Sequence, residues 1–479
     1  ILAFIILSFA YFFPADIEGR ILFQHDTAAG VGAGQESKEY LERTGERTRW
    51  TNSIFGGMPT YQMSPSYDST TSLKGVEKVY RLFLPDYVVL TFIMMLGFYI
   101  LLRAFGISAW LAGLGGVIWA FSSYFFILIP AGHIWKFVTL AYIPPTIAGV
   151  VLAYRKKYLL GGIVTALFIA LQIQSNHIQM SYYFMFVILF FVGAYFEDAY
   201  RKKELPHFFK ASGVLALAAV VGVCINISNL YHTYEYSKET MRGKSELKQE
   251  GAAASQTSSG LDRDYITNWS YGIGETLTLL VPNVKGGGSG STMSQSEAAM
   301  AKANPMYNGI YSQLPQYFGE QPWTAGPVYV GAFVMFLFVL GCFIVKGPLK
   351  WALLGATIFS ILLSWGKNFM GLTDFFIDYV PMYNKFRAVS SILVIAEFTI
   401  PLLAIFALKE ILSKPDMLKQ EKNCRGVIAA LVLTAGVAFI LAVAPGAFFS
   451  SFITNFRTSN RCCIFRYNNS IIQVTIIYS

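Results

Sequence analysis

Charged residues are scarce in this sequence. Asp, Glu, Lys and Arg together make up 14% of its 479 residues, whereas hydrophobic residues make up 54%. Soluble domains contain about 25% charged residues, so this composition excludes a cytosolic enzyme, a disordered scaffold and a small disulfide-stabilised domain. A multi-pass membrane protein is the class that fits.

Cysteines and nucleotide-binding motifs are also scarce or absent. Of the five cysteines, Cys224 and Cys342 fall inside apolar runs and Cys424 lies beside one. This excludes a disulfide framework in exported loops, and the spacing matches no zinc site. No Walker-type or dinucleotide-binding glycine pattern occurs, so no nucleotide cofactor is expected. The glycine-rich run 286–291 has linker composition and predicts a flexible tether or lid.

Long apolar runs dominate what is present. A helix needs about 20 predominantly apolar residues to cross the hydrocarbon core. About eleven runs approach this criterion: 1–13, 86–102, 107–129, 138–154, 158–174, 178–196, 208–229, 327–345, 349–365, 388–408 and 426–444. The alternation with period two that is typical of membrane barrels is absent. We therefore expect an all-α polytopic membrane protein.

Lys and Arg mark one side of this predicted bundle. Short cytoplasmic loops are enriched in both residues, and every second short loop here is basic: Arg103, 155–157, 201–203, Lys346 with Lys350, and 409–425. The opposite short loops carry Lys136, Lys367, Lys385 and Arg387. The basic side is therefore expected to be cytoplasmic. The net charge of +9 is then a topology signal and does not indicate a nucleic-acid partner.

This orientation divides the chain into six segments. Residues 1–13 form the first span, 14–85 a long extracytoplasmic loop, 86–229 a six-helix block, 230–326 a second long extracytoplasmic loop and 327–444 a four-helix block. Residues 445–479 are interpreted as an atypical tail, because the sequence loses helical periodicity after about Phe456. A frameshift or a gene-fragment end would explain this change, and a genuine short tail is the alternative. The chain begins inside an apolar run without an initiator Met, so the start of the first span is expected to be missing.

Ionisable residues next to a membrane are costly and therefore informative. Those on the predicted outer side are His25, Asp26, His133, Lys136, His177, Glu320 and Arg387, and His232 lies outside as well. Taken singly, each is explained as a solvated or capping residue, an interfacial anchor or a snorkelling side chain. Together they predict one shared extracytoplasmic site.

Glu397 is the acidic residue placed well inside a predicted span. Proton coupling is one interpretation, and a structural carboxylate that is neutralised by burial or paired with a polar neighbour is the other. A transporter usually has several such groups and broken helices near the midplane. The structural interpretation is therefore favoured.

The order of several short segments resembles the bacterial YfhO-like membrane proteins. A QHD segment at 24–26 and WTNSIFGGMPTYQ at 50–62 are followed by AGHIWK, SNHIQMSYY, YFGEQPWTAGPVYVG and PMYNKFRA. The resemblance covers roughly residues 1–450 and is greatest to members from Bacteroidota. Members generally continue past the end of this chain, which implies missing helices and a missing C-terminal exported domain.

That family is in turn similar to the GT-C glycosyltransferases, polytopic enzymes that pass a sugar from a polyprenyl-phosphate carrier to an acceptor outside the cytoplasmic membrane. The resemblance implies a GT-C-like fold in the bacterial inner membrane with an extracytoplasmic active face. It implies Asp26 as the catalytic carboxylate, with Asp16 and Glu18 as less favoured substitutes. It also implies that Arg387 faces the lipid phosphate.

The chemistry of glycosyl transfer suits these residue types. A carboxylate deprotonates or orients the acceptor hydroxyl, and cations stabilise the departing phosphate. Asp26 would be the general base, and Glu320 would position the acceptor or bind a metal with Asp26. His25, His133, Lys136, His177 and Arg387 would bind the lipid phosphate or the sugar. The first loop has no DxD triplet, so a divalent metal is left open.

The leading hypothesis is therefore a membrane glycosyltransferase with a polyprenyl-phosphate-linked sugar as donor and an envelope polymer or lipid as acceptor. The alternative is a transporter or flippase for a lipid-linked glycan. It predicts a polar cavity across the helices, for which the sequence offers chiefly Glu397, Gln172 and Asn226. A non-catalytic membrane scaffold is the third class.

Overall fold

The computed structural model describes residues 1–63, 65, 67–243, 260–301 and 304–444. The predicted tail at 445–479 lies outside these residues. The described chain is mostly helical, and its one named sheet pairs Trp50–Thr51 (β1) with Met58–Pro59 (β2) in antiparallel register. It separates into two compact units. Unit 1 comprises Ile1–Phe121 and Phe125–Leu261, and unit 2 comprises Ser122–Tyr124 and Asp262–Ser479.

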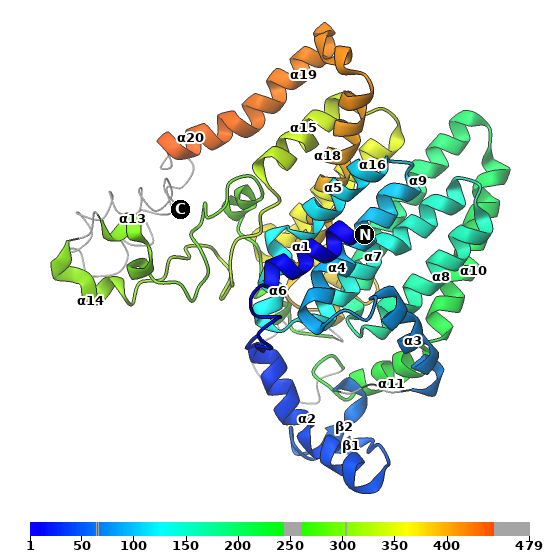
Figure 1. Ribbon diagram of the computed structural model, residues 1–479, viewed down its shortest axis with the longest axis vertical. Helices are drawn as coiled ribbons and strands as arrows, with labels where there is room; N and C mark the ends of the chain where they lie inside the picture. Colours follow the sequence, from blue (N-terminus) through cyan, green and yellow to red (C-terminus); the bar gives the residue numbers. More distant parts are fainter. Residues whose placement is uncertain (64, 66, 244–259, 302–303, 445–479) are drawn as a thin grey trace. The chain divides into compact units, whose positions relative to one another are not determined.

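Unit 1 contains the helices of the first half of the chain (Figure 1). They are α1 (Leu2–Phe12), α2 (His25–Thr44), η1 (Thr60–Gln62), η2 (Asp68–Thr70), α3 (Thr71–Tyr80), α4 (Asp86–Ala104), α5 (Ala109–Ala120), α6 (Ser123–Ala131), α7 (Ile134–Tyr154), α8 (Tyr158–Gln174), α9 (Ile178–Lys202), α10 (Leu205–Cys224) and α11 (Ile227–Ser237). The first residues of α6 belong to unit 2.

Unit 2 contains short helices followed by long apolar ones. They are α12 (Arg263–Thr267), η3 (Gly274–Leu279), η4 (Met293–Gln295), α13 (Glu297–Met300), η5 (Pro305–Tyr307), α14 (Asn308–Tyr311), α15 (Ala332–Ile344), α16 (Pro348–Ser364), η6 (Gly366–Phe369), α17 (Met370–Tyr379), η7 (Tyr383–Lys385), η8 (Val389–Leu393), α18 (Val394–Ser413), η9 (Pro415–Lys419), α19 (Glu421–Leu431), the π-helical turn η10 (Val432–Gly436) and α20 (Val437–Val443).

Six helical segments of the described chain are long and apolar enough to cross a membrane, or eight if each of two bent pairs counts as one span. The six are α4, α7, α9, α10, η8 with α18, and α19 to α20. The bent pairs are α5 with α6, at 48°, and α16 with η6 and α17, at 109°. The predicted spans at 1–13, 158–174 and 327–345 coincide with the shorter apolar helices α1, α8 and α15. The largely helical fold is thus confirmed, and the number of eleven crossings stays a prediction.

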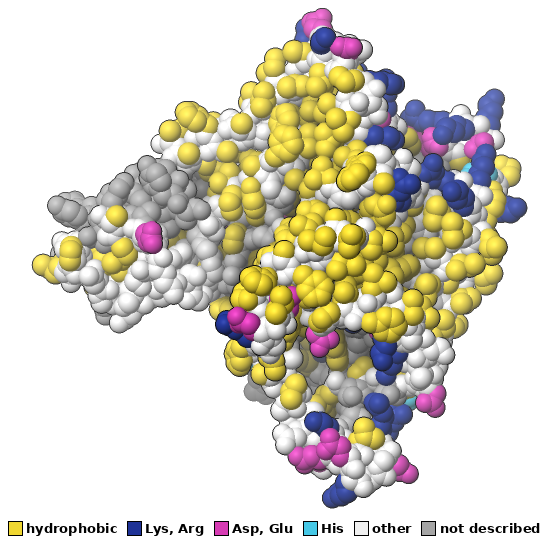
Figure 2. Space-filling view, in the orientation of Figure 1, with side chains coloured by type: hydrophobic (Ala, Val, Ile, Leu, Met, Phe, Trp, Pro, Cys, Tyr) yellow, Lys and Arg dark blue, Asp and Glu magenta, His cyan; other side chains and the backbone are white. Residues whose placement is uncertain are grey.

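Each unit has one apolar helix that is almost entirely buried. In unit 1 this is α7, 94% buried over its apolar window, which packs against α4, α8, α9 and α10. In unit 2 it is the η8–α18 segment, 89% buried, which packs against α15 and α16. By contrast, α10 and the α19–α20 segment are each only 22% buried. Exposed apolar side chains of the latter include Ile428, Leu433 and Phe439, and apolar side chains cover much of the face of the molecule seen in Figure 2. Such continuous apolar exposure suits a lipid environment and not water.

The basic loops of unit 1 lie together at one end of its helices. An Arg155 guanidinium N–H donates to the carbonyl of Ala104 at 2.5 Å, and Nζ of Lys156 lies 2.9 Å from a carboxylate oxygen of Glu204. Lys and Arg side chains gather around the ends of α9 and α10 in Figure 2. The loops at 103–107, 155–157 and 201–204 therefore share one end, as helices that cross back and forth require.

Glycines bring α7 and α8 into backbone contact. A Cβ placed on Gly149 would lie 2.3 Å from Oγ1 of Thr165, and one on Gly161 would lie 2.5 Å from the backbone nitrogen of Ala153. Small residues allow this close approach between membrane helices. The short α8 is thereby held tightly against the buried α7.

The glycine-rich run 286–291 is packed, so the prediction of a flexible tether is wrong. The N–H of Ser289 donates to the carbonyl of Thr324 at 2.7 Å, and the N–H of Thr324 donates back to Oγ of Ser289 at 2.9 Å. Gly286 has a φ of +82°, and a Cβ there would overlap the carbonyl oxygen of Gln316. The glycines allow neighbouring backbone segments to approach closely. This role cannot be distinguished from that of a flexible linker by composition alone.

Candidate functional site

The start of α2 docks on the end of α6. Gln24 is 5% exposed, and its Nε2 donates to the carbonyl of Ile129 at 2.7 Å. Its Oε1 accepts a hydrogen bond from Oγ1 of Thr27 at 2.9 Å. Gly132, with a φ of +81°, permits this approach, because a Cβ there would lie 2.9 Å from the backbone nitrogen of Thr27. The docking fixes the position of the two residues that follow Gln24.

Those two residues place a carboxylate between two imidazoles. Oδ2 of Asp26 lies 3.0 Å from Nε2 of His133, and Oδ1 lies 3.5 Å from Nδ1 of His25. The side chains of Asp26 and His133 are 54% and 48% exposed, so the pair is open to solvent. A carboxylate next to an imidazole orients the ring and stabilises its protonated form. The pair can therefore accept or deliver a proton at the surface.

Lys136 and His177 lie in the same neighbourhood. Lys136 is on the first turn of α7 and is 9% exposed. Burial, followed by the nearby charges of Lys136 and His133, lowers the pKa of His177 to about 3. Nδ1 of His177 is buried and has no hydrogen-bond partner among the described residues. Unit 1 thus brings Asp26, His133, Lys136 and His177 to one end of its helices, and their catalytic role stays a prediction.

The other two predicted site residues belong to unit 2. Glu320 is exposed, its N–H donates to a buried carboxylate, that of Glu275, at 3.2 Å, and its carbonyl accepts a hydrogen bond from Nζ of Lys367 at 3.4 Å. Arg387 is also exposed, and its guanidinium donates to the hydroxyl of Tyr265 at 2.7 Å and lies over that ring. A site that Glu320 and Arg387 share with Asp26 stays a prediction.

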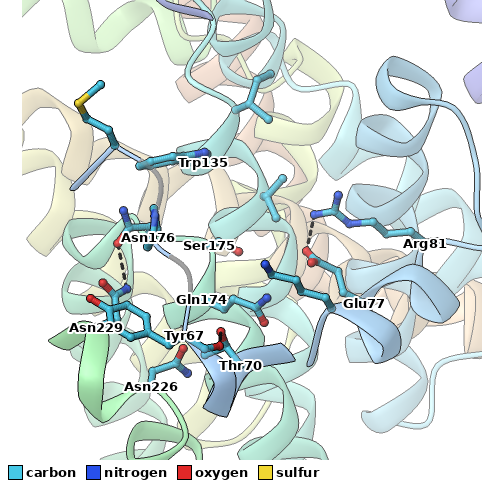
Figure 3. Close-up of a pocket in the computed structure, with 15 residues that line it drawn as sticks. Tyr67, Thr70, Glu77, Arg81, Trp135, Gln174, Ser175, Asn176, Asn226 and Asn229 are labelled. Carbon is cyan, nitrogen blue, oxygen red and sulfur yellow. Dashed lines mark hydrogen bonds and ion pairs between the residues drawn. The ribbon is translucent and has the colours of Figure 1, made fainter. Parts of the chain in front are cut away.

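Unit 1 contains a pocket of about 400 Å³. Among its lining residues the sequence indicates only Asn226, for a polar cavity across the helices, and Lys136 and His177 lie beside other residues of the pocket. Its walls come from four chain segments, at 63–81, 134–138, 174–176 and 226–229 (Figure 3). Most of its polar residues are uncharged amides and hydroxyls. Site residues are selected from the sequence by their charge, so these side chains are passed over. The one sequence signal was the density of amides in QSN at 174–176 and NISN at 226–229.

The pocket adjoins two turns of the chain, one that carries His133 of the Asp26–His133 pair and one that carries His177. Ile134 and Trp135 line the pocket and directly follow His133, and Asn176 lines it and directly precedes His177. Both turns lie at the end of α7 that is far from Arg155. The acid–base pair and the pocket are therefore neighbouring features of one surface of unit 1.

Metal ligands are not clustered in the part of the chain that the structure describes. No group of three or more His, Cys, Asp and Glu side chains there could hold a metal ion. The pair formed by Asp26 and His133 is smaller than such a group. Metal dependence stays open, as it was from the sequence.

The chain was also compared with known proteins. No family model, no curated protein and no solved structure matches it. The likeness to YfhO-like proteins and GT-C enzymes therefore stays a prediction.

Proposed function

We propose that this chain is a multi-pass glycosyltransferase of the bacterial inner membrane, of the YfhO-like and GT-C-like type. It would transfer a sugar from a polyprenyl-phosphate carrier to an envelope polymer or lipid at the extracytoplasmic face. The observation that supports the proposal is the solvent-open Asp26–His133 pair, with 3.0 Å between Oδ2 and Nε2. It lies at the end of α7 away from the basic loops, which is where the predicted topology puts the outer face.

In this proposal Asp26 is the general base. It accepts the proton of the acceptor hydroxyl while that oxygen bonds to the anomeric carbon of the sugar. The bond between the anomeric carbon and the phosphate oxygen breaks, and polyprenyl phosphate leaves as an anion. His133 orients Asp26, and Lys136 of the same unit is the cation proposed to stabilise the leaving phosphate.

The test is sugar transfer in membranes that carry the Asp26→Asn variant. Asparagine has nearly the same shape and cannot take up the proton, so transfer should fall about 100-fold or more while the abundance of the protein is unchanged. Asp416→Asn is the matched control, because that carboxylate is 86% exposed on η9 and pairs with Lys419. Full transfer activity in the Asp26→Asn membranes would remove Asp26 as the base.

A flippase for a lipid-linked glycan is the second candidate, and Glu397 favours it. This carboxylate is completely buried on α18 and accepts a hydrogen bond from Oγ of Ser122 within unit 2. A carboxylate inside a membrane helix is often functional. A flippase predicts that Glu397→Gln stops lipid translocation while Asp26→Asn does not. A transferase predicts that Asp26→Asn has the larger effect on the envelope glycan.

A further inference from the structure

Buried amide oxygens without partners line the pocket of unit 1 (Figure 3). Asn226 and Asn229 are 1% and 4% exposed. Their NH₂ groups are used, since Asn226 donates to the carbonyl of Ala170 at 3.0 Å and Asn229 donates to Oδ1 of Asn176 at 3.2 Å. Oδ1 of both residues and Oε1 of Gln174 accept no hydrogen bond among the described residues. An unsatisfied buried acceptor costs about 1–3 kcal/mol, so these atoms indicate a ligand that donates hydrogen bonds.

Two charges in the pocket wall, those of Glu77 and Arg81, neutralise each other. An Arg81 guanidinium nitrogen lies 2.5 Å from Oε1 of Glu77, and the Tyr142 hydroxyl donates to that same oxygen at 2.8 Å. Nε of Arg81 donates to the Tyr142 hydroxyl at 3.2 Å. The other charged residue of the lining, Lys74, is exposed on α3. Lys74 is therefore solvated, and the partly buried charges of the wall, those of Glu77 and Arg81, are already paired. Since binding a buried anion requires a cation that is not already neutralised, the buried part of the wall favours an uncharged ligand.

Two aromatic rings complete the lining. Trp135 is 44% exposed, and Tyr67 stacks on His232 with ring centroids 5.6 Å apart and planes within 9°. The Tyr67 hydroxyl lies 3.2 Å from Nδ1 of His232, which holds the ring in place. Aromatic rings offer a flat apolar face beside polar groups, and the C–H face of a pyranose packs on such a surface while its hydroxyls reach neighbouring amides.

We infer that this pocket binds an uncharged saccharide. The sugar hydroxyls donate to the amide oxygens of Gln174, Asn226 and Asn229, and the partly exposed ring of Trp135 contacts the sugar ring. A volume of about 400 Å³ falls within the usual range of small-molecule sites, about 300–1,000 Å³. The inference rests on the proposed function in one respect, because it takes the bound saccharide to be the glycan on which the Asp26–His133 pair acts.

The test uses the purified full chain in lipid nanodiscs and four uncharged probes: glucose, galactose, mannose and N-acetylglucosamine. Saturation-transfer NMR should show saturable binding of at least one sugar. The double variant Asn226→Ala/Asn229→Ala should weaken that binding about tenfold, as the loss of two neutral hydrogen bonds predicts. Asn423→Ala is the matched control, because that amide lies on α19 of unit 2 and should leave the affinity unchanged.

A second variant tests the inference independently, in case the double asparagine variant does not fold. Trp135→Ala removes a partly exposed ring without touching the buried amides, and it should also weaken sugar binding. Unchanged affinity in both variants, or no saturable binding of any of the four sugars, overturns the inference. Equal competition by inorganic phosphate also overturns it, because the pocket would then be an anion site.

The experiments distinguish an error in the saccharide-binding inference from an error in the transferase proposal. If Asp26→Asn membranes transfer sugar normally while the double asparagine variant loses sugar binding, the proposed base is wrong and the pocket stands. If Asp26→Asn abolishes transfer and the double asparagine variant binds sugar normally, the base stands and the saccharide pocket is wrong.

Discussion

Oδ2 of Asp26 and Nε2 of His133 lie 3.0 Å apart, although one is the second residue of α2 and the other immediately precedes α7. The contact does not depend on these two side chains alone. Gln24 is anchored to the carbonyl of Ile129, so the loop that follows α1 is fixed to the end of α6, just before the turn that carries His133. The geometry of the pair is thereby built into the fold of unit 1.

The first prediction concerns His133 as a positioning residue. His133→Gln should lower sugar transfer by up to about 100-fold, because a carboxylate that is no longer held in place loses its alignment with the acceptor. The double variant Asp26→Asn/His133→Gln should be no slower than Asp26→Asn alone, since residues that act as a unit are not additive. The control is His207→Gln, whose ring lies at the other end of α7 against the carbonyl of Tyr154. Additive losses in the double variant would contradict this role.

The second prediction concerns pH and His177. Its folded-state pKa is lowered to about 3, chiefly by burial, whereas an unfolded histidine titrates near 6.5. Between these values the unfolded chain binds a proton that the folded chain does not, so stability falls as the pH drops from about 6.5 toward 3. Above pH of about 6.5 this residue contributes no pH dependence. His177→Asn should therefore flatten the decrease in melting temperature between pH 7 and pH 5, and an unchanged slope would contradict the burial of His177.

The third prediction concerns packing between α7 and α8. Gly161→Ala should destabilise the protein by about 1–3 kcal/mol or more, because the new Cβ would lie 2.5 Å from the Ala153 nitrogen. Gly213→Ala on α10 is the matched control, since a Cβ there meets no atom within 4 Å and helix propensity favours alanine. Thermal unfolding in detergent measures both variants. Equal melting temperatures would show that α8 can move away from α7 at little cost.

The fourth prediction concerns topology. Single cysteines at Gln35 and Lys157, in a chain whose native cysteines are replaced by serine, should be labelled from opposite sides of the membrane. A membrane-impermeant maleimide added to intact cells should label Gln35→Cys, which is exposed on α2. It should label Lys157→Cys only after lysis. Labelling of both in intact cells would contradict the predicted orientation of unit 1.

The apolar helices could be predicted from the sequence because their signal is local. A run such as 138–154 is apolar all round, and the structure buries it on every side as α7. The positions of Lys and Arg in short loops are also a local signal in the sequence. The basic residues at 155–157 and 201–203 predicted a shared end of the bundle, and the contacts of Arg155 and Lys156 are found there.

Features that depend on contacts between distant segments could not be predicted. Helix α2 has no buried residue, so its sequence has no apolar stripe from which a helix could be predicted. The glycines at 286–288 resemble a linker until the backbone that packs against them is known. The pocket is built from amides such as Asn229, and whether an amide oxygen has a partner becomes known only once the chain is folded.

The shared turns at 133–135 and 176–177 have a mechanical consequence. Trp135 is two residues from His133, and Asn176 is bonded directly to His177. A ligand that displaces Trp135 would therefore also displace His133 and change its distance from the Asp26 carboxylate.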